Sequence, residues 1–116
     1  MATALQEELI LRVRSLLSPD LPVREVAMFG GRAVMVNEKM IVSASRSGEL
    51  LVRVPARRHD ELLARPGARQ AEMGAGRTMG PGWLTVSAES LAAEEELAYW
   101  IAAAMSHNES AARGRG

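Results

Sequence analysis

The residues of this sequence that come closest to a catalytic or metal-binding set are His59, Asp60 and Glu61, which are consecutive. Their segment is expected to be helical, and consecutive helical residues point to different faces, so the three side chains cannot meet on one metal ion. Ligand pairs on a helix need a spacing of three or four residues, where Leu62 and Leu63 stand. We therefore expect a solvated helix face here and no metal site.

Other reactive side chains are scarce. The sequence has no cysteine and two histidines, which excludes disulfides, thiolate nucleophiles and cysteine-bound zinc or iron–sulfur clusters. A hydrolase needs a nucleophile, a base and oxyanion donors in one pocket, and no recognisable set of this kind is present. We expect no catalytic residues, no cofactor and no enzymatic activity.

A glycine-rich segment over residues 74–82 invites comparison with phosphate-binding loops. It lacks the lysine of a P-loop, and it runs into a predicted strand rather than into the start of a helix. We expect a flexible loop whose backbone amides bind an anion weakly at most. A small-molecule-binding or enzymatic domain that uses this loop is kept as an alternative function.

The charges of the chain balance overall but not locally. Fourteen Lys and Arg residues match fourteen Asp and Glu residues, so no net charge draws the whole chain to nucleic acid or to an anionic membrane. Residues 46–77 hold seven arginines and four acidic residues, whereas the only charged residues in 78–105 are four glutamates. This asymmetry suits self-association or a charged protein partner. The candidate basic surface consists of Arg53, Arg57, Arg58 and Arg77.

Nucleic acid is a less favoured partner. Lysine occurs once, and aromatic residues make up 3% of the chain, so stacking platforms for single strands are not expected. A weak DNA-binding regulator is the third functional alternative.

These side chains must be positioned by a small domain. The chain has 116 residues, of which 47% are hydrophobic, and it shows neither a signal-peptide start nor an apolar run long enough to span a bilayer. We expect one cytoplasmic domain without membrane contact.

Hydrophobic spacing predicts helices at the start, middle and end of the chain. Thr3 and Gln6 form a capping-box pattern before an apolar stripe at Leu5, Leu9, Ile10, Val13, Leu16 and Leu17. The second helix is expected over residues 56–64, and the third runs from Ser87 or Ser90 to about Ser106. Residues 107–116 show no apolar pattern, so we expect a domain over residues 1–106 and a disordered polar tail.

Between the helices, the period changes to that of strands. Runs rich in β-branched residues predict strands at 23–28, 32–36, 40–44, 50–54 and 83–86, with a weaker one at 70–73. The first connections are too short for parallel crossovers, and residues 37–39 form a link of hairpin length. The predicted fold class is α+β: an antiparallel β-meander sheet packed against N-terminal, middle and C-terminal helices.

One short motif stands at the end of the first predicted strand, Met28-Phe29-Gly30-Gly31. Phe29 is the single phenylalanine and is expected to bury its ring, and the glycines allow a turn, a bulge or a close backbone approach. By itself the motif predicts a core anchor before a bulge.

With its surroundings, the motif resembles the N-terminal domain of the TfoX family, also called Sxy, the bacterial regulators of natural competence. Members carry an amphipathic helix, then M-F-G-G, a short β-meander and a stretch similar to residues 50–54. A segment similar to R-x-M-x-G-W-x-x-V follows, here residues 77–86 with one extra residue before Trp83. The closing helix carries a Leu-x-x-Trp pattern, matched by Leu97 and Trp100.

The resemblance spans about residues 5–105 and has two departures. The family usually places aromatic residues in the meander, where this chain has Ala33, Val34, Met35, Met40 and Ile41. Full-length competence regulators add a second domain similar to helix-hairpin-helix modules, whose functions are not carried over to this chain.

The resemblance implies a small regulatory or protein-interaction domain, with a link to transcriptional or competence regulation. We expect a homodimer or another protein partner. The expected interaction residues are Met28, Phe29, Gly30 and Gly31, and the expected structural anchors are Trp83, Leu97 and Trp100.

Overall fold

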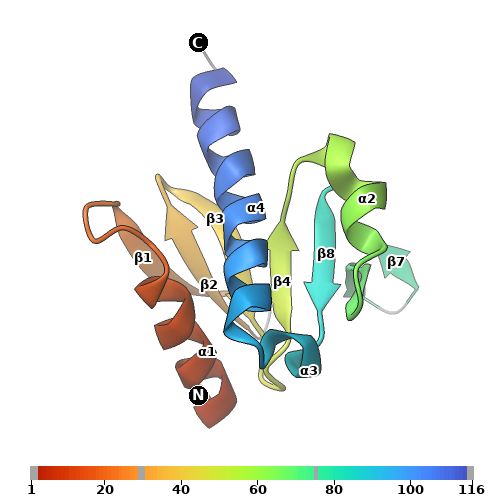
Figure 1. The fold of residues 1–116 in the computed structure, drawn as a ribbon, viewed down its shortest axis with the longest axis horizontal. Helices are drawn as coiled ribbons and strands as arrows, with labels where there is room; N and C mark the ends of the chain where they lie inside the picture. Colours follow the sequence, from red (N-terminus) through yellow and green to blue (C-terminus); the bar gives the residue numbers. More distant parts are fainter. Residues whose placement is uncertain (1–2, 29–30, 75, 115–116) are drawn as a thin grey trace.

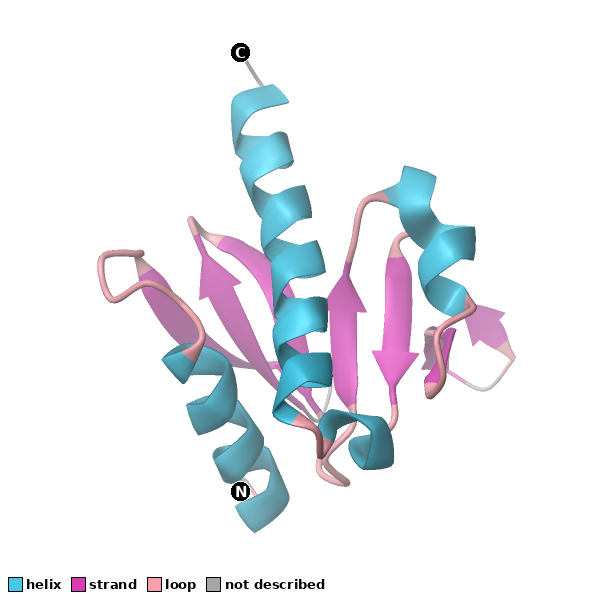
Figure 2. Ribbon diagram, in the orientation of Figure 1, coloured by secondary structure: helices cyan, strands magenta, loops and turns pink. Residues whose placement is uncertain are grey.

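The computed structural model describes residues 3–28, 31–74 and 76–114 of the chain. It contains a twisted sheet with helices across one face, as Figures 1 and 2 show. The predicted α+β class is therefore confirmed, as are the antiparallel sheet and the N-terminal, middle and C-terminal helices. In the part of the chain that the structure describes, no helix has a stretch that is both long and apolar enough to cross a bilayer.

The first helix, α1 (Ala4–Ser15), begins as the sequence predicts. The Thr3 hydroxyl accepts a hydrogen bond from the Gln6 backbone at 3.1 Å, and the Gln6 side chain accepts one from the Thr3 backbone at 2.9 Å. This reciprocal pair satisfies two backbone donors that a helix start leaves unpaired. The stripe is narrower than predicted, because Leu5 is 53% exposed while Leu9 and its buried neighbours face the core.

Six strands form one antiparallel sheet in the order β1-β2-β3-β4-β8-β5. The first four follow one another along the chain, as the short connections predict, whereas β8 inserts between β4 and β5. In spatial order, their bounds are Val23–Met28, Gly31–Val36, Lys39–Ala44, Leu50–Arg53, Trp83–Val86 and Ala68–Gln70.

The strand expected at residues 70–73 is divided in two. β5 ends at Gln70, and β6 (Glu72–Gly74) pairs instead with β7 (Arg77–Thr78) in a separate small hairpin. The expectation of a loop throughout residues 74–82 is therefore wrong at Gly74 and at Arg77–Thr78, which are strand residues.

The connection between β2 and β3 is a tight turn at Asn37 and Glu38, which have φ of 54° and 64°. Two positive φ values are typical of a type I′ hairpin turn, whose twist matches that of the strands. Glu38 is an uncommon residue there, and its carboxylate accepts a hydrogen bond from Arg24 Nη2 on β1 at 2.6 Å. The link is thus one residue shorter than the predicted one, since β3 begins at Lys39.

The core lies between the sheet and the helices. Val34, Val42, Val52 and Leu84 are cross-strand neighbours in one row and are completely buried. Leu97 and Trp100 of the last helix are also completely buried in this cluster.

Each of the two helices predicted after β4 is divided into two shorter elements. A 3₁₀ turn (η1, Ala56–Arg58) precedes α2 (His59–Leu63). Ser87 caps α3 (Ala88–Leu91), and the long α4 (Glu94–Gly114) then crosses the sheet.

α4 continues beyond the predicted end at Ser106. Asn108 is 2% exposed; its Nδ2 donates to the Val36 carbonyl at 2.9 Å and its Oδ1 accepts from Asn37 Nδ2 at 3.2 Å. The predicted disordered tail from His107 is therefore wrong as far as Gly114. Hydrophobic periodicity could not show this, because the contact with the sheet is made by a polar residue.

Candidate interaction site at the sheet edge

β1 is the outermost strand of the sheet and, within the described segments, has a paired strand on one side only. The Asn37 amide donates to the Pro22 carbonyl at 3.3 Å, which fixes the alternation of hydrogen bonds between β1 and β2. The residues bonded to β2 are then Arg24, Val26 and Met28. Those whose backbone N–H and C=O groups point away from the sheet are Val23, Glu25 and Ala27.

The charged side chains of β1 are engaged in ion pairs within the chain. Glu25 accepts from Arg14 Nη1 of α1 at 2.7 Å and from Arg32 Nε of β2 at 3.1 Å. The hydrogen bond from Arg14 lowers the pKa of the Glu25 carboxyl below its usual value, with a smaller contribution from Arg32. Arg24 likewise forms an ion pair, with Glu38 of the turn between β2 and β3. Natural sheet edges are often protected by free charges, and the charges of this strand are already paired.

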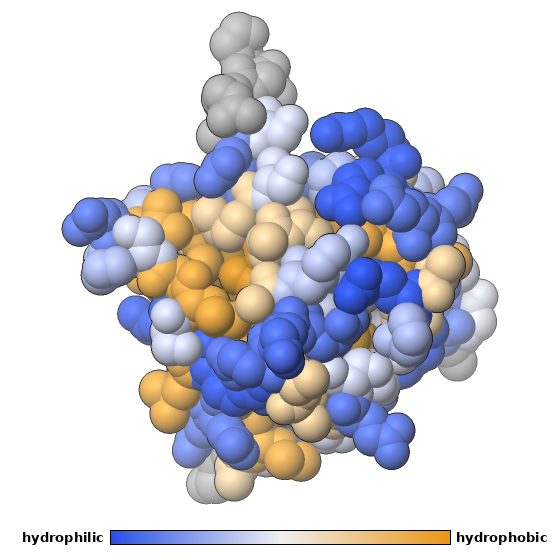
Figure 3. Space-filling view, viewed as in Figure 1, coloured by the Kyte–Doolittle hydropathy of each residue, from blue (hydrophilic) through white to orange (hydrophobic). Residues whose placement is uncertain are grey.

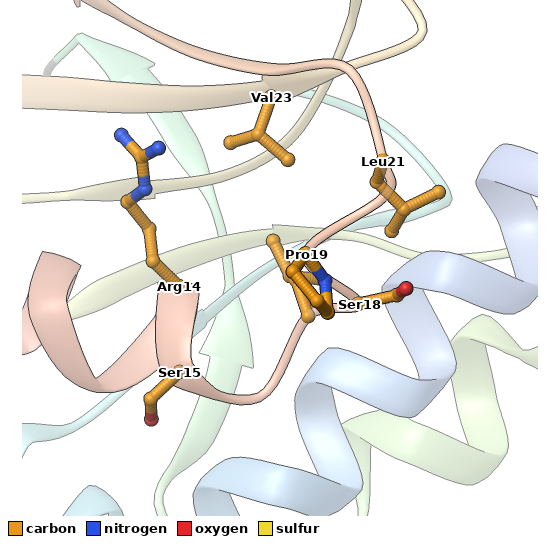
Figure 4. A pocket seen from close by; sticks show the side chains of 7 residues that line it. Arg14, Ser15, Ser18, Pro19, Leu21 and Val23 are labelled. Atoms are coloured by element: carbon orange, nitrogen blue, oxygen red, sulfur yellow. The ribbon is translucent and has the colours of Figure 1, made fainter.

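A hollow of about 350 Å³ adjoins the first residue of β1. Figure 4 shows Arg14 reaching from α1 toward the sheet, with Pro19 and Leu21 of the connecting segment and Val23 of β1 around the same space. Leu21 and Val23 are partly buried against the core, and Figure 3 shows an apolar surface on this side of the molecule, between β1 and α4. The edge therefore combines unpaired backbone groups with apolar side chains.

An exposed leucine lies on the helix next to this edge. Leu11 of α1 is 70% exposed. It stands three residues before Arg14, so the two side chains share a side of the helix, and Arg14 reaches β1.

The Met28–Gly31 motif lies at the hairpin that joins this edge strand to β2. Met28 ends β1 and Gly31 begins β2 as its cross-strand partner, whereas Phe29 and Gly30 lie outside the described residues. A Cβ at Gly31 would lie 2.8 Å from Ser43 Oγ and 2.9 Å from the Ala44 carbonyl oxygen of β3. Glycine is thus required there by the close approach of two strands.

The four arginines of the candidate basic surface do not share one environment. The Arg53 guanidinium lies 4.8 Å from the centre of the half-buried Trp83 ring, and burial lowers its pKa. Its Nη1 is buried against Gly82 and has no hydrogen-bond partner within the described segments of the chain. Arg58 is bound to Glu61 at 2.9 Å, while Arg57 and Arg77 are exposed.

The basic middle and the acidic last third of the chain contact each other. Arg65 donates to Glu96 at 2.8 Å and lies 3.6 Å from the centre of the Tyr99 ring. Glu96 also accepts from Trp100 Nε1 at 3.1 Å, which ties this ion pair to the core. The charge asymmetry of the sequence is therefore partly neutralised inside one molecule.

His59 is not part of a solvated face, and that expectation is wrong. It is 9% exposed, its Nδ1 accepts from the Gly82 amide at 2.9 Å, and its Nε2 lies 2.9 Å from Gln70 Oε1. These bonds assign the proton to Nε2. The signal in the sequence was Leu62, the completely buried residue three positions later on the same side of α2.

The glycine-rich segment is held by this same network. Gln70 Nε2 donates to the Gly80 carbonyl at 3.1 Å, and the Gly82 amide is already bound to His59. Among the described residues, no three His, Asp or Glu side chains are placed to hold a metal ion.

The residues that shape the β1 edge were missed by the sequence analysis. Arg14 and Arg32 meet on Glu25 from two elements, and no spacing rule pairs them. Leu11 lies outside the predicted apolar stripe, and an exposed leucine beside that stripe was the available signal.

The fold and this edge define a small α+β domain with an open sheet, whose outer strand β1 has a neighbouring strand on one side only among the described residues. The sequence profile of the TfoX N-terminal domain matches residues 15–108, which is most of the chain. The chain therefore belongs to the TfoX N-terminal domain family, as the motifs predicted. No curated protein and no solved structure matches it.

Proposed function

We propose that this domain is a regulatory module that works by binding another protein through the edge of β1, without catalysing a reaction. The observation that carries the proposal is the row of outward-facing backbone groups at Val23, Glu25 and Ala27. An extended segment that pairs with such an edge gains main-chain hydrogen bonds, and pockets beside the edge add specificity.

Two features support this assignment. The ion pairs of Arg24 and Glu25 leave the strand without a free charge to repel a partner strand, and the hollow at Val23 offers apolar contact next to it. Membership of the TfoX N-terminal domain family fits a regulatory domain. The proposal also includes a role of the domain in transcription, including natural competence, and a location in the cytoplasm.

The test uses Ala27→Pro. The Ala27 N–H points away from β2, so proline removes an outward donor and blocks a neighbouring strand without removing a bond between β1 and β2. The matched control is Ala27→Ser, which keeps the N–H. Transcript profiles are compared among cells that carry the wild-type, deleted, Ala27→Pro or Ala27→Ser gene.

We expect Ala27→Pro to reproduce the profile of the deletion, with melting temperature and protein abundance close to wild type, and Ala27→Ser to match wild type. A wild-type profile for Ala27→Pro, or a deletion that changes no transcript, would overturn the proposal.

A further inference from the structure

We infer that the segment bound at the β1 edge is the free C-terminal end of another polypeptide, which runs antiparallel to β1 and places an apolar last residue and its carboxylate in the hollow beside Arg14. This inference rests on the proposed function, because it names the chemistry of the partner at the same edge.

The arginines around Glu25 leave one positive charge uncompensated. Glu25 accepts from Arg14 at 2.7 Å and from Arg32 at 3.1 Å, so two guanidinium groups share one carboxylate. The Arg14 side chain is 44% exposed, and in the described part of the chain no hydrogen bond uses its Nε or Nη2. Asp20, the acidic residue of the connecting segment, is exposed and does not line the hollow. A guanidinium with N–H groups to spare binds a carboxylate through charge-assisted hydrogen bonds, so the charge at this place favours an anionic ligand.

The end of α1 opposes an anion less than Arg14 attracts one. A helix C-terminus carries about half a negative charge on its last carbonyl groups, against the full positive charge of a guanidinium. The carbonyls of Val13 and Arg14 already accept from backbone amides, at 3.0 Å and 3.2 Å, and that of Arg12 accepts from the Ser15 hydroxyl at 2.7 Å. Arg14 therefore decides the sign of the ligand.

The other walls of the hollow are largely apolar. Besides Arg14, it is lined by Leu17, Pro19, Leu21 and Val23, and Figure 4 shows the two serine hydroxyls of its lining pointing away from the guanidinium. Its volume of about 350 Å³ is at the small end of the range for ligand sites, which suits one apolar side chain with a carboxylate. The hollow therefore fits an apolar group that carries an acid.

The strand edge favours the end of a chain over a free acid. The outward backbone groups of Val23 adjoin the hollow, whereas the Leu21 amide, two residues earlier, already donates to the Ser18 carbonyl at 3.1 Å. A strand paired with β1 thus meets the connecting segment just beyond Val23, and a chain that ends there fits. The carboxylate end of a polypeptide reaches this place when the strand runs antiparallel to β1, which is also the more stable direction.

The experiment begins with short random peptides fused to a carrier through their N-termini, so that each C-terminus is free. Selection on the wild-type protein should enrich peptides with an apolar last residue. A selected peptide is then made as the free acid and as the C-terminal amide, and fluorescence anisotropy measures both. We expect the amide to bind about tenfold more weakly, because it lacks the charge that Arg14 meets.

Two arginine variants assign this difference to one side chain. Arg14→Gln should bind the acid about tenfold more weakly than wild type does and the amide equally well. The matched control is Arg24→Gln, which removes an arginine from the other face of β1 and should bind both forms as wild type does. Both ion pairs are exposed, so the two variants should melt close to wild type.

Several outcomes would overturn the inference. These are the absence of any enriched peptide, equal binding of acid and amide, and an Arg14→Gln variant that loses both forms alike. Enriched peptides with an internal acidic residue and no preference at the end would assign the edge to a continuous acidic strand. Hexanoate that displaces the peptide at an equal concentration would assign the hollow to a free acid. Either result rejects a chain end as the ligand.

The two proposals fail separately. If acid and amide bind equally while Ala27→Pro still reproduces the deletion in cells, the edge binds a strand in another way and only the chain end is rejected. If the acid binds through Arg14 while Ala27→Pro cells behave as wild type, the chain-end site stands and the regulatory function at this edge is rejected.

Discussion

The two outer strands of the sheet differ in length and in the bonding of their outward backbone groups. β1 is six residues long and presents the backbone groups of Val23, Glu25 and Ala27 to its surroundings. β5 is three residues long, and the outward amide of Ala68 already donates to the Arg65 carbonyl at 3.1 Å. The longer edge presents three residues to another strand, whereas the shorter one begins with an amide that is already bonded within the chain.

The polar side chains near the two edges differ as well. At β5, His59 and Gln70 form a partly buried network that joins α2, β8 and the glycine-rich segment. At β1, Glu25 is held by Arg14 and Arg32 at the surface, with its side chain 25% exposed. The comparison teaches that hydrogen bonds between side chains and backbone hold the segments at the β5 end together, whereas partly exposed ion pairs hold the side chains of β1 and leave its backbone edge available.

The largest expected effect comes from opening the β5 end. His59→Ala removes two hydrogen bonds and leaves the buried Gly82 amide without an acceptor, so we expect a loss of about 3 kcal/mol in the free energy of unfolding. Urea denaturation measures it. Asp60→Ala, on the exposed neighbour, should stay within about 0.5 kcal/mol of wild type. Equal losses for the two variants would mean that the network does not stabilise this end of the sheet.

The next effect concerns the anchor of α4 on the β1 side of the sheet. Asn108→Ala leaves the Val36 carbonyl without its buried donor, and we expect a loss of about 2 kcal/mol. The exposed Glu109→Ala is the control in the same denaturation assay. If Asn108→Ala unfolds like the control, the last turns of α4 are not docked.

Removing the ion pairs at β1 should cost less. Glu25→Gln is expected to lower stability by about 1 kcal/mol at neutral pH, because the ion pairs are partly exposed. The pKa of Glu25 is lowered in the fold, so its contribution is present above the usual carboxyl pKa and is lost as the pH falls through the lower folded value.

Thermal unfolding between about pH 6 and about pH 3 tests this sign. The wild type should lose more stability than Glu25→Gln over that range. Glu8→Gln, a change at an exposed residue of α1, should behave like wild type. A Glu25→Gln curve parallel to that of the wild type would refute the role of the pair.

The smallest effect belongs to His107 on α4. Burial lowers the pKa of this imidazole, and Arg53 and Lys39 lower it further. The unfolded chain therefore binds the proton more readily, so stability is complete above about pH 6.5 and declines as the pH falls. His107→Gln should remove this pH dependence. We expect the loss of unfolding free energy that it removes to be under about 0.5 kcal/mol. Unfolding curves at intervals across this range detect it, and an unchanged slope would argue against the assignment.

Local patterns were sufficient for much of the fold. The Thr3–Gln6 capping box, the strands from 23 to 54 and their antiparallel pairing follow from side-chain period and short connections. The insertion of β8 between β4 and β5 does not, because it depends on contacts between residues distant in the chain.

The interaction site was less accessible to prediction for a physical reason. The motif at residues 28–31 lies at the hairpin next to this edge, but the edge itself is defined by which backbone groups lack a neighbour, and that is a property of the assembled sheet. Polar contacts such as Asn108 with Val36 and His59 with Gly82 also leave no hydrophobic period to detect.

The short, self-bonded β5 has a consequence for stoichiometry. A chain with two available edges adds copies at both ends and grows into an open filament, whereas a chain with one available edge is saturated by a single partner. In the proposed complex one partner strand fills the β1 edge, and β5 is a poor second edge because it stops at Gln70 and its Ala68 amide already bonds to Arg65. Assembly through the sheet edges is therefore expected to stop at one partner for each chain.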